Sequence, residues 1–206
     1  MALGRGMRLV LGLLLAVVTL APTSSEASVW TRESGPARSP AGYVAFCRAQ
    51  PQNCVASGSG AAEVLTQARW GELLEANRMA NLLIMPRADI DQYSREEVWA
   101  VPGLFGDCED YALLKRKWLI QQGWPTSTVL MTVVFDEIGE GHAVLVVRTS
   151  GGDFVLDNKT DQILLWNETP YKFVKRQSTT DPSRWVRIGT PERHDVPTAA
   201  RPDARN

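Results

Sequence analysis

Cys108 is the residue of this sequence best suited to chemistry, because Asp107, Glu109 and Asp110 surround it. A buried structural cysteine packs among apolar neighbours, since an unpaired carboxylate taken out of water is costly. Cys108 instead follows a turn closed by Gly106 and begins a predicted amphipathic helix. The start of a helix lowers the pKa of a thiol, and the thiolate is the nucleophile. We therefore expect an exposed or half-exposed, reactive thiol.

A reactive thiol needs a base, and the chain has two histidines. His194 lies in the C-terminal tail and is set aside. His142 begins a predicted strand directly after a glycine loop, and is the predicted base. Asp157, on the next predicted strand, is the leading candidate to orient the imidazole. The sequence thus predicts nucleophilic catalysis by a triad of Cys108, His142 and Asp157.

The register of the two strands decides whether Asp157 can reach His142. A tight Gly151-Gly152 turn would leave the two residues about 13 Å apart along the strand, which is too far. A register in which Asp157 lies opposite Val144 makes it a diagonal neighbour of His142. We predict this second register, reached through a wider loop or a bulge. If the turn is the tight one, Asp161 becomes the rival candidate.

The first residues resemble an export signal rather than part of a fold. Arg5 and Arg8 precede an apolar run, and the small residues Ser25 and Ala27 mark a cleavage site. These features predict a signal peptide over residues 1–27. The alternative is an uncleaved anchor helix, but the run is short for a hydrocarbon core of ~30 Å. We expect a periplasmic or secreted protein.

Export changes the interpretation of the three cysteines. In an oxidising compartment an odd count predicts one pair and one free thiol, or an intermolecular bond. Cys47 and Cys54 bracket a short polar loop that contains Pro51, and are the natural disulfide pair. Metal binding by these two is the alternative, but the histidines are too few and too far away. Cys108 is then the free thiol.

Helices followed by strands must position these groups. Apolar residues at helical spacing predict helices over residues 61–85, ended by Pro86, and over 108–122. The pattern then changes to short apolar runs, which predict strands. The predicted strands are 129–135, 142–148, 154–157, 163–166, 171–174 and 185–188. The expected fold class is α+β, with N-terminal helices packed on an antiparallel sheet.

Length and composition indicate one globular domain. Residues 28–42 are polar and rich in Ser, Gly and Pro, which predicts a flexible lead-in. The domain is expected over 43–190, and a disordered tail rich in Pro, Ala and charge over 191–206. Hydrophobic residues make up 44% and charged residues 22% of the chain. The net charge of -1 provides no basic surface for nucleic acid.

Three motifs of the chain resemble the bacterial transglutaminase-like cysteine proteinases, a family that includes LapG-type periplasmic proteases. The resemblance covers roughly residues 43–189, and its motifs are Gly106–Ala112, Gly141–Leu145 and Leu156–Asn158. It implies a papain-like or transglutaminase-like fold. It also implies peptide hydrolysis by a Cys/His/Asp triad, carried over onto Cys108, His142 and Asp157.

The resemblance further implies calcium dependence, with Asp107 and Glu109 as ligands. It implies protein substrates such as surface adhesins, and control by an inner-membrane receptor for cyclic di-GMP. The charges support the ion, because carboxylates beside a thiol raise its pKa and a hard cation cancels their charge. The alternative role for these acids is a first turn that suits the helix dipole.

The predicted reaction begins with attack of Cys108 on a peptide carbonyl, with the Cys108 backbone N–H as one oxyanion donor. Trp99 and Asn77 are candidates for the second donor. If an amine rather than water resolves the acyl-enzyme, the same site is a transglutaminase-type acyltransferase. A third hypothesis is a non-catalytic, calcium-binding periplasmic protein with a vestigial triad.

Overall fold

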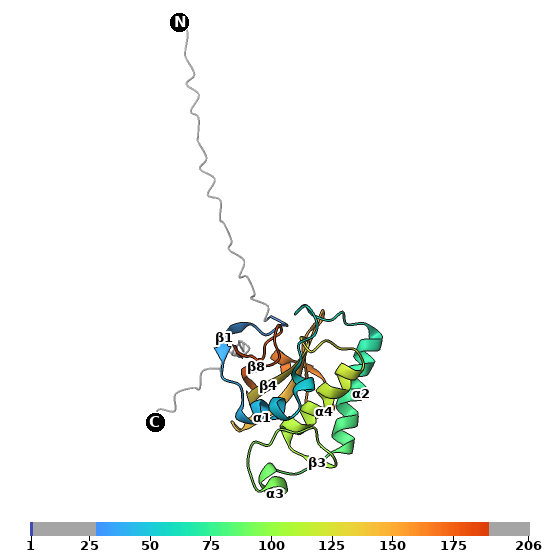
Figure 1. Ribbon diagram of the computed structural model, residues 1–206. Helices are drawn as coiled ribbons and strands as arrows, with labels where there is room; N and C mark the ends of the chain where they lie inside the picture. Colours follow the sequence, from blue (N-terminus) through green and yellow to red (C-terminus); the bar gives the residue numbers. More distant parts are fainter. Residues whose placement is uncertain (2–27, 190–206) are drawn as a thin grey trace, which may run out of the picture.

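The structure, a computed structural model, describes Met1 and residues 28–189 (Figure 1). Apart from Met1, the predicted signal peptide lies outside the described residues. The predicted C-terminal tail and His194 also lie outside them.

A single antiparallel sheet forms the centre of the described chain, with the strand order β1-β9-β8-β4-β5-β6-β7. A short parallel pair, β2 with β3, lies apart from it. The strands are β1 (Glu33–Ala37), β2 (Met85–Pro86), β3 (Phe105–Gly106), β4 (Val129–Phe135), β5 (Gly141–Thr149), β6 (Gly152–Leu156), β7 (Leu164–Leu165), β8 (Lys172–Gln177) and β9 (Trp185–Ile188).

The longer helices precede most of the sheet, and α2 and α4 lie side by side (Figure 1). This arrangement confirms the α+β class with helices packed on an antiparallel sheet. The helices are α1 (Ala41–Ala49), α2 (Gln67–Leu83), α3 (Asp89–Tyr93) and α4 (Cys108–Gln121), and the 3-10 helices are η1 (Pro51–Cys54) and η2 (Trp166–Glu168).

Two apolar clusters bury the two faces of the sheet. On the helix face, Leu73 of α2 and Leu119 of α4 pack with Leu145 of β5. On the other face, Val144 of β5 packs with Trp166 of η2. Neighbouring residues of β5 thus enter different clusters, as alternation along a strand requires. Burial on both faces explains why β5 shows a continuous apolar run instead of polar alternation.

The β5–β6 hairpin has the predicted register but not the predicted turn. Thr149 pairs with Gly152, so the tight turn consists of Ser150-Gly151. The expected wider loop or bulge was therefore wrong. Gly152 has φ +126°, which glycine tolerates without strain, and it closes the turn. Moving the turn one residue earlier brings Asp157 to the diagonal position beside His142.

Residues 28–42, predicted as a flexible lead-in, instead contain β1 and the start of α1. Strand β1 pairs antiparallel with β9. The backbone N–H and the hydroxyl of Thr31 donate to Asp153 at 2.8 and 2.6 Å. Arg176 pairs with Glu33 at 3.0 Å. Polar contacts rather than alternating apolar side chains hold this segment, so hydrophobic periodicity did not reveal it.

Helix α2 begins at Gln67, later than the predicted start at 61. Glu63 forms an isolated parallel bridge with Thr149 instead. The Thr66 hydroxyl accepts a hydrogen bond from the Arg69 N–H at 3.1 Å, and so caps the helix.

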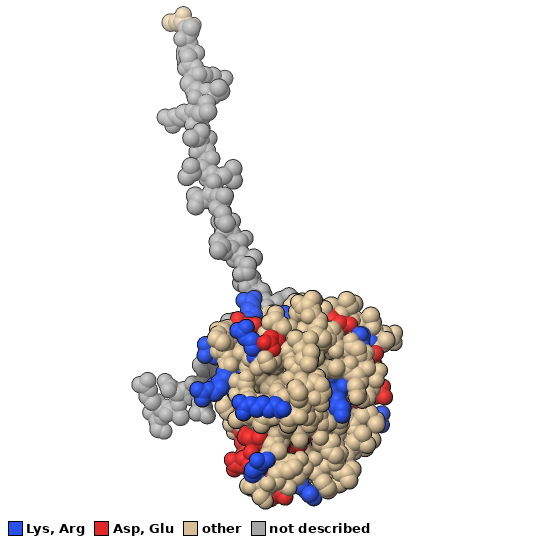
Figure 2. Space-filling model, in the orientation of Figure 1, with Lys and Arg blue, Asp and Glu red and all other residues tan. Residues whose placement is uncertain are grey.

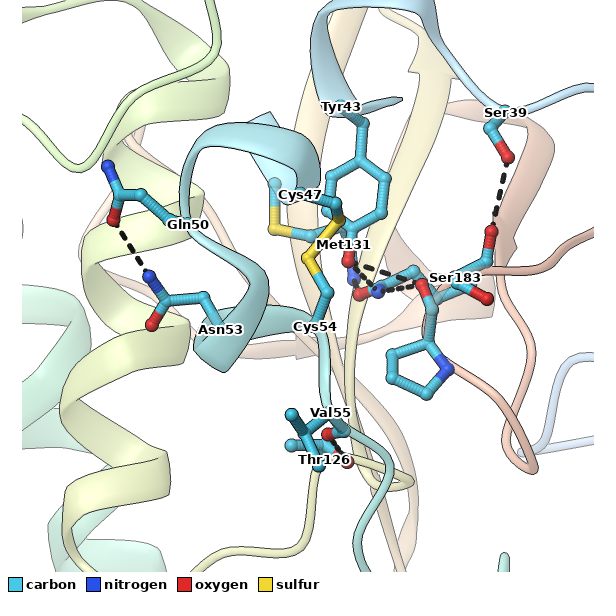
Figure 3. Close-up of a disulfide and its surroundings, with 12 residues drawn as sticks. Ser39, Tyr43, Cys47, Gln50, Asn53, Cys54, Val55, Thr126, Met131 and Ser183 are labelled. Carbon is cyan, nitrogen blue, oxygen red and sulfur yellow. Dashed lines mark hydrogen bonds between the residues drawn. A yellow bond between two sulfur atoms is a disulfide. The ribbon is translucent and has the colours of Figure 1, made fainter. Parts of the chain in front are cut away.

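Cys47 and Cys54 form the predicted disulfide, which joins α1 to the end of η1 (Figure 3). Inside this loop Asn53 donates to the Gln50 side chain at 2.8 Å. The buried Arg116 of α4 donates to the Asn53 carbonyl at 2.8 Å. The disulfide loop is thereby fastened to the helix that carries Cys108.

Acidic and basic side chains are interspersed on the face shown in Figure 2, and neither sign covers it. Within residues 28–189, no helix combines the length and the hydropathy needed to cross a membrane.

Candidate active site

Cys108 is the first residue of α4, and its thiol is free of any disulfide. Asp107 occupies the N-cap position, but its side chain makes no capping hydrogen bond. The carboxylate of Asp107 is therefore left for other interactions. A side chain at Gly106 would place a Cβ 2.7 Å from Cβ of Asp110. Only glycine lets the chain approach α4 so closely at this turn.

Asp110 fastens the approach loop to α4. Its Oδ1 accepts a hydrogen bond from the Ala100 N–H at 2.8 Å. Burial raises the pKa of Asp110 to about 7. Of the three acids around the thiol, Asp110 thus has a structural role, because it holds the segment that carries Trp99.

His142 and Asp157 are hydrogen bonded, with Nε2 2.9 Å from Oδ1. Burial raises the pKa of Asp157, but hydrogen bonds from His142 and Tyr171 outweigh it and hold that pKa below its ordinary value. An ionised carboxylate only accepts, so this hydrogen bond favours the tautomer with the hydrogen on Nε2, which leaves Nδ1 able to accept a proton. The structure brings these two predicted residues together as the register required.

Tyr171 is a member of the candidate site that sequence reasoning missed. Its hydroxyl donates to Oδ2 of Asp157, and its ring lies edge-on to the His142 ring with centroids 5.6 Å apart. The Lys159 N–H donates to Oδ1 at 3.1 Å. Both carboxylate oxygens are therefore bound, which fixes the imidazole. No local signal marks Tyr171, which begins a predicted strand like many core tyrosines.

Cys108 and His142 line one cavity of about 270 Å³. Cys108 also lines a second hollow of about 490 Å³, together with Asp107 and Asn158. The thiol thus lies where two recesses meet. An extended chain could pass over such a point, with one side chain on either side of the sulfur.

The surroundings of Cys108 favour the thiol over the thiolate. Burial raises the pKa of Cys108 far above its ordinary value, and the Glu109 carboxylate raises it further. The sulfur donates to Oε2 of Glu109 at 3.1 Å. The backbone N–H of Ala143 opposes this shift by donating toward the sulfur. Deprotonation therefore requires that the charge of Glu109 be offset.

Asp89, Asp107 and Glu109 converge beside the thiol, with one carboxylate oxygen from each within 4.8 Å of the others. Burial and the charge of Asp107 raise the pKa of Glu109 to about 8. Burial also raises the pKa of Asp107, whose buried Oδ1 lacks a hydrogen-bond partner in the described chain. Clustered hard oxygens with an unsatisfied atom fit a divalent cation.

Asp89 is the member of this acidic cluster that sequence reasoning missed as a ligand. It lies in α3, in the acidic turn that also contains Asp91. Its side chain accepts from the Val98 N–H, which fixes it beside α4. Only the fold reveals which of the two acids faces Glu109.

The contacts of the remaining candidate site residues distinguish them from one another. Trp99 is buried and lines the cavity with the thiol, so it remains a candidate oxyanion donor. Its one ring N–H donates to Glu97 at 3.3 Å, so it would have to leave that partner to bind an oxyanion. Asn77 donates to the Thr160 carbonyl at 3.2 Å and is not among the residues lining that cavity. Asp161 accepts from Asn81 of α2 rather than from His142.

Comparison with families of known proteins places the chain in one of them. The family described as bacterial transglutaminase-like cysteine proteinase BTLCP matches residues 33–193. Comparison with curated proteins finds no match.

Among solved structures, Legionella pneumophila LapG in its calcium-bound form is similar, with 23% identity and a TM-score of 0.46. The similarity covers 52% of this chain and 64% of that one. A second LapG structure gives the same identity and TM-score, with 62% of its chain covered. The chain therefore spans less than two thirds of each LapG chain.

Proposed function

The chain belongs to the bacterial transglutaminase-like cysteine proteinases, and on that premise we propose an exported cysteine endopeptidase that uses Cys108, His142 and Asp157. One observation carries the proposal. Cys108 and His142 line the same cavity, and Asp157 holds His142 at 2.9 Å. Residues 43–190 would form the catalytic domain, and the family match from residue 33 adds β1 to it.

Each member of the triad has one role in the proposed hydrolysis. His142 Nδ1 takes the proton of Cys108, and the thiolate sulfur bonds to the peptide carbonyl carbon. The Cys108 N–H at the start of α4 donates to the oxyanion. The imidazolium returns its proton to the leaving amine, and water then releases the acid product. Asp157 holds the ring and stabilises its positive charge.

Calcium is the proposed cofactor, with Asp107 and Glu109 as predicted ligands and Asp89 as a third. Bound there, it would supply positive charge that offsets three carboxylates. Glu109 would then no longer be free to accept the Cys108 proton. Support comes from the convergence of the three carboxylates and from the unpartnered Oδ1 of Asp107.

The substrate, partner and location are proposed from the resemblance. The substrate would be a protein of the cell surface, such as an adhesin. The regulator would be an inner-membrane receptor, and the protein would act in the periplasm or be secreted. The two recesses on either side of Cys108 suit an extended segment of polypeptide.

The test is to incubate the purified protein with candidate surface proteins and with a fluorescent primary amine, in excess calcium or excess EGTA. We expect defined fragments in calcium and none in EGTA. Cys108→Ala and His142→Ala should produce none in either condition. Fragments formed equally in EGTA would overturn the calcium role alone.

Two other outcomes identify the alternatives. Incorporation of the amine into the candidate proteins without cleavage would indicate an acyltransferase on the same triad. Calcium binding without any reaction that depends on Cys108 would indicate a non-catalytic calcium-binding protein, and would overturn the peptidase.

A further inference from the structure

The carboxylate that orients His142 lies outside regular structure. Strand β6 ends at Leu156 and β7 begins at Leu164, so Asp157 is the first residue of the connection between them. Its backbone is not held by a partner strand. The position of the carboxylate therefore depends on what fastens residues 157–163.

Asn81 of α2 makes three contacts with this connection. Its Nδ2 lies 3.0 Å from the Asp157 carbonyl, 3.2 Å from the Thr160 carbonyl and 2.8 Å from Oδ1 of Asp161. All three atoms are acceptors, so the nitrogen and not the oxygen of the amide must face them. One amide group thus joins the two ends of the turn that begins at Asp157.

Two neighbouring polar groups do not duplicate this role. Asn77, one turn earlier on α2, donates to the Thr160 carbonyl, and within residues 28–189 its side chain forms no hydrogen bond with Asp157. Lys115 of α4 is buried, but its Nζ makes no hydrogen bond with the described residues. Asn81 is therefore the α2 side chain that reaches the backbone of Asp157.

We propose that Asn81 is a positioning residue for the active site, which fixes Asp157 and through it the His142 ring. The proposal rests on the proposed triad and names a further residue on which that triad depends. A donated hydrogen bond to the Asp157 carbonyl restrains the backbone two bonds from its Cα. Catalytic geometry tolerates little displacement, and about 1 Å can cost on the order of 100-fold in rate.

The test is the rate at which iodoacetamide alkylates Cys108 at pH 7 in excess calcium, which needs no substrate. The variants of the full chain are Asn81→Ala, Asn81→Asp and the matched control Asn77→Ala. Asn81→Asp keeps the shape but removes the donor. His142→Ala sets the rate without a base. We expect both Asn81 variants to react about tenfold more slowly, and Asn77→Ala to stay within about twofold of wild type.

A second measurement separates positioning from folding. The ring N–H of His142 gives a proton NMR signal only while its hydrogen bond protects it from exchange with water. This signal should weaken in Asn81→Ala and persist in Asn77→Ala. Urea unfolding of the two variants should show that Asn77→Ala, which alters a fully buried side chain, loses at least as much stability.

Each outcome bears on a different claim. Equal rates for wild type and His142→Ala would overturn the proposed triad itself. If alkylation is slow in His142→Ala but has the wild-type rate in both Asn81 variants, only the role of Asn81 is overturned. Equal losses in Asn77→Ala and Asn81→Ala would also overturn it, because they would show general loosening of the α2 contact.

Discussion

Glu109 acts on the Cys108 thiol both as a hydrogen-bond acceptor and as a negative charge. The sulfur donates to its Oε2 at 3.1 Å, and both effects raise the pKa of the thiol beyond what burial does. The same carboxylate belongs to the acidic cluster. One side chain can therefore hold the thiol inactive and respond to a cation.

Glu109→Gln should separate these two roles. At about pH 9, where the Glu109 carboxyl of wild type with its pKa of about 8 is ionised, removing that charge lowers the pKa of Cys108, and alkylation by iodoacetamide in excess EGTA should be about tenfold faster than in wild type. Calcium should then have little further effect. The control is Asp91→Asn, which neutralises an exposed acid of α3 outside the cluster. A Glu109→Gln protein that still responds fully to calcium would contradict the assignment.

Tyr171→Phe should loosen the Asp157 carboxylate, which orients His142, because it removes one of its hydrogen bonds. It removes the donor to Oδ2 of Asp157 and should cost about 2 kcal/mol of unfolding free energy, as a hydrogen bond to a charged group does. Cleavage of the protein substrate should slow, mainly through kcat. Tyr43→Phe is the matched control, because Tyr43 is a buried tyrosine that donates to the neutral Pro182 carbonyl.

The pH dependence of stability gives a second measurement on Tyr171→Phe. The pKa of Asp157 is lowered in the folded state, so its stabilisation is present above pH ~4 and is lost as the pH falls through the folded pKa. Losing the tyrosine raises that folded pKa. Acid unfolding should therefore begin at a higher pH than in wild type, and an unchanged acid midpoint would contradict the role of Tyr171.

At the residue scale, the residue types that catalysis requires predicted more of the candidate site than sequence neighbourhood did. Cys108, His142 and Asp157 could be proposed because a nucleophile, a base and an orienting acid each require particular residue types. Asp89 and Tyr171 could not, because each joins the site from an element distant in sequence. Nothing within a few residues of either shows which group it will face.

Elements show where prediction from periodicity succeeds and where it fails. Helix α4 and strand β4 lie within one residue of their predicted bounds, although α4 also buries the charged residues Lys115 and Arg116. Strand β1 has no apolar periodicity, since Asp153 and Arg176 hold its neighbourhood through polar contacts. The β5–β6 register was predictable only through the chemical requirement that Asp157 reach His142.

We expect removal of the Cys47–Cys54 disulfide to lower the stability of the fold but to leave the reactivity of Cys108 unchanged. Replacing Cys47 and Cys54 with alanine should lower the unfolding free energy by about 2–3 kcal/mol, because the loop it closes is short. Alkylation of Cys108 should keep its wild-type rate in the folded double variant. A large fall in that rate would show that the loop also positions α4, through Arg116 and Asn53.

At the scale of the whole molecule, the acids around the thiol make stability depend on pH in an uncommon direction. The folded pKa values of Glu109 and Asp110 are raised to about 8 and about 7, mainly by burial. A carboxyl whose pKa is raised by folding stabilises the protein fully below its unfolded pKa. That stabilisation is lost as the pH rises through the folded value.

Without a metal ion, the unfolding free energy should therefore fall between pH 5 and pH 8. Calcium would compete with the protons on Glu109, so it should stabilise the protein more at pH 8 than at pH 5. Urea unfolding in excess EGTA and in excess calcium at both pH values measures this. Equal stabilisation by calcium at both would contradict a site built from these carboxylates.

The close approach of Gly106 to Asp110 should couple substitutions at these two positions. Any side chain at 106 would collide with Asp110, while a smaller residue at 110 would release the Ala100 N–H that Asp110 binds. A substitution at either position alone should therefore destabilise this turn, so the two positions should be substituted together in evolution. Among descendants of a common ancestor, we expect departures from Gly106 to coincide with departures from Asp110 and with a reshaped approach loop.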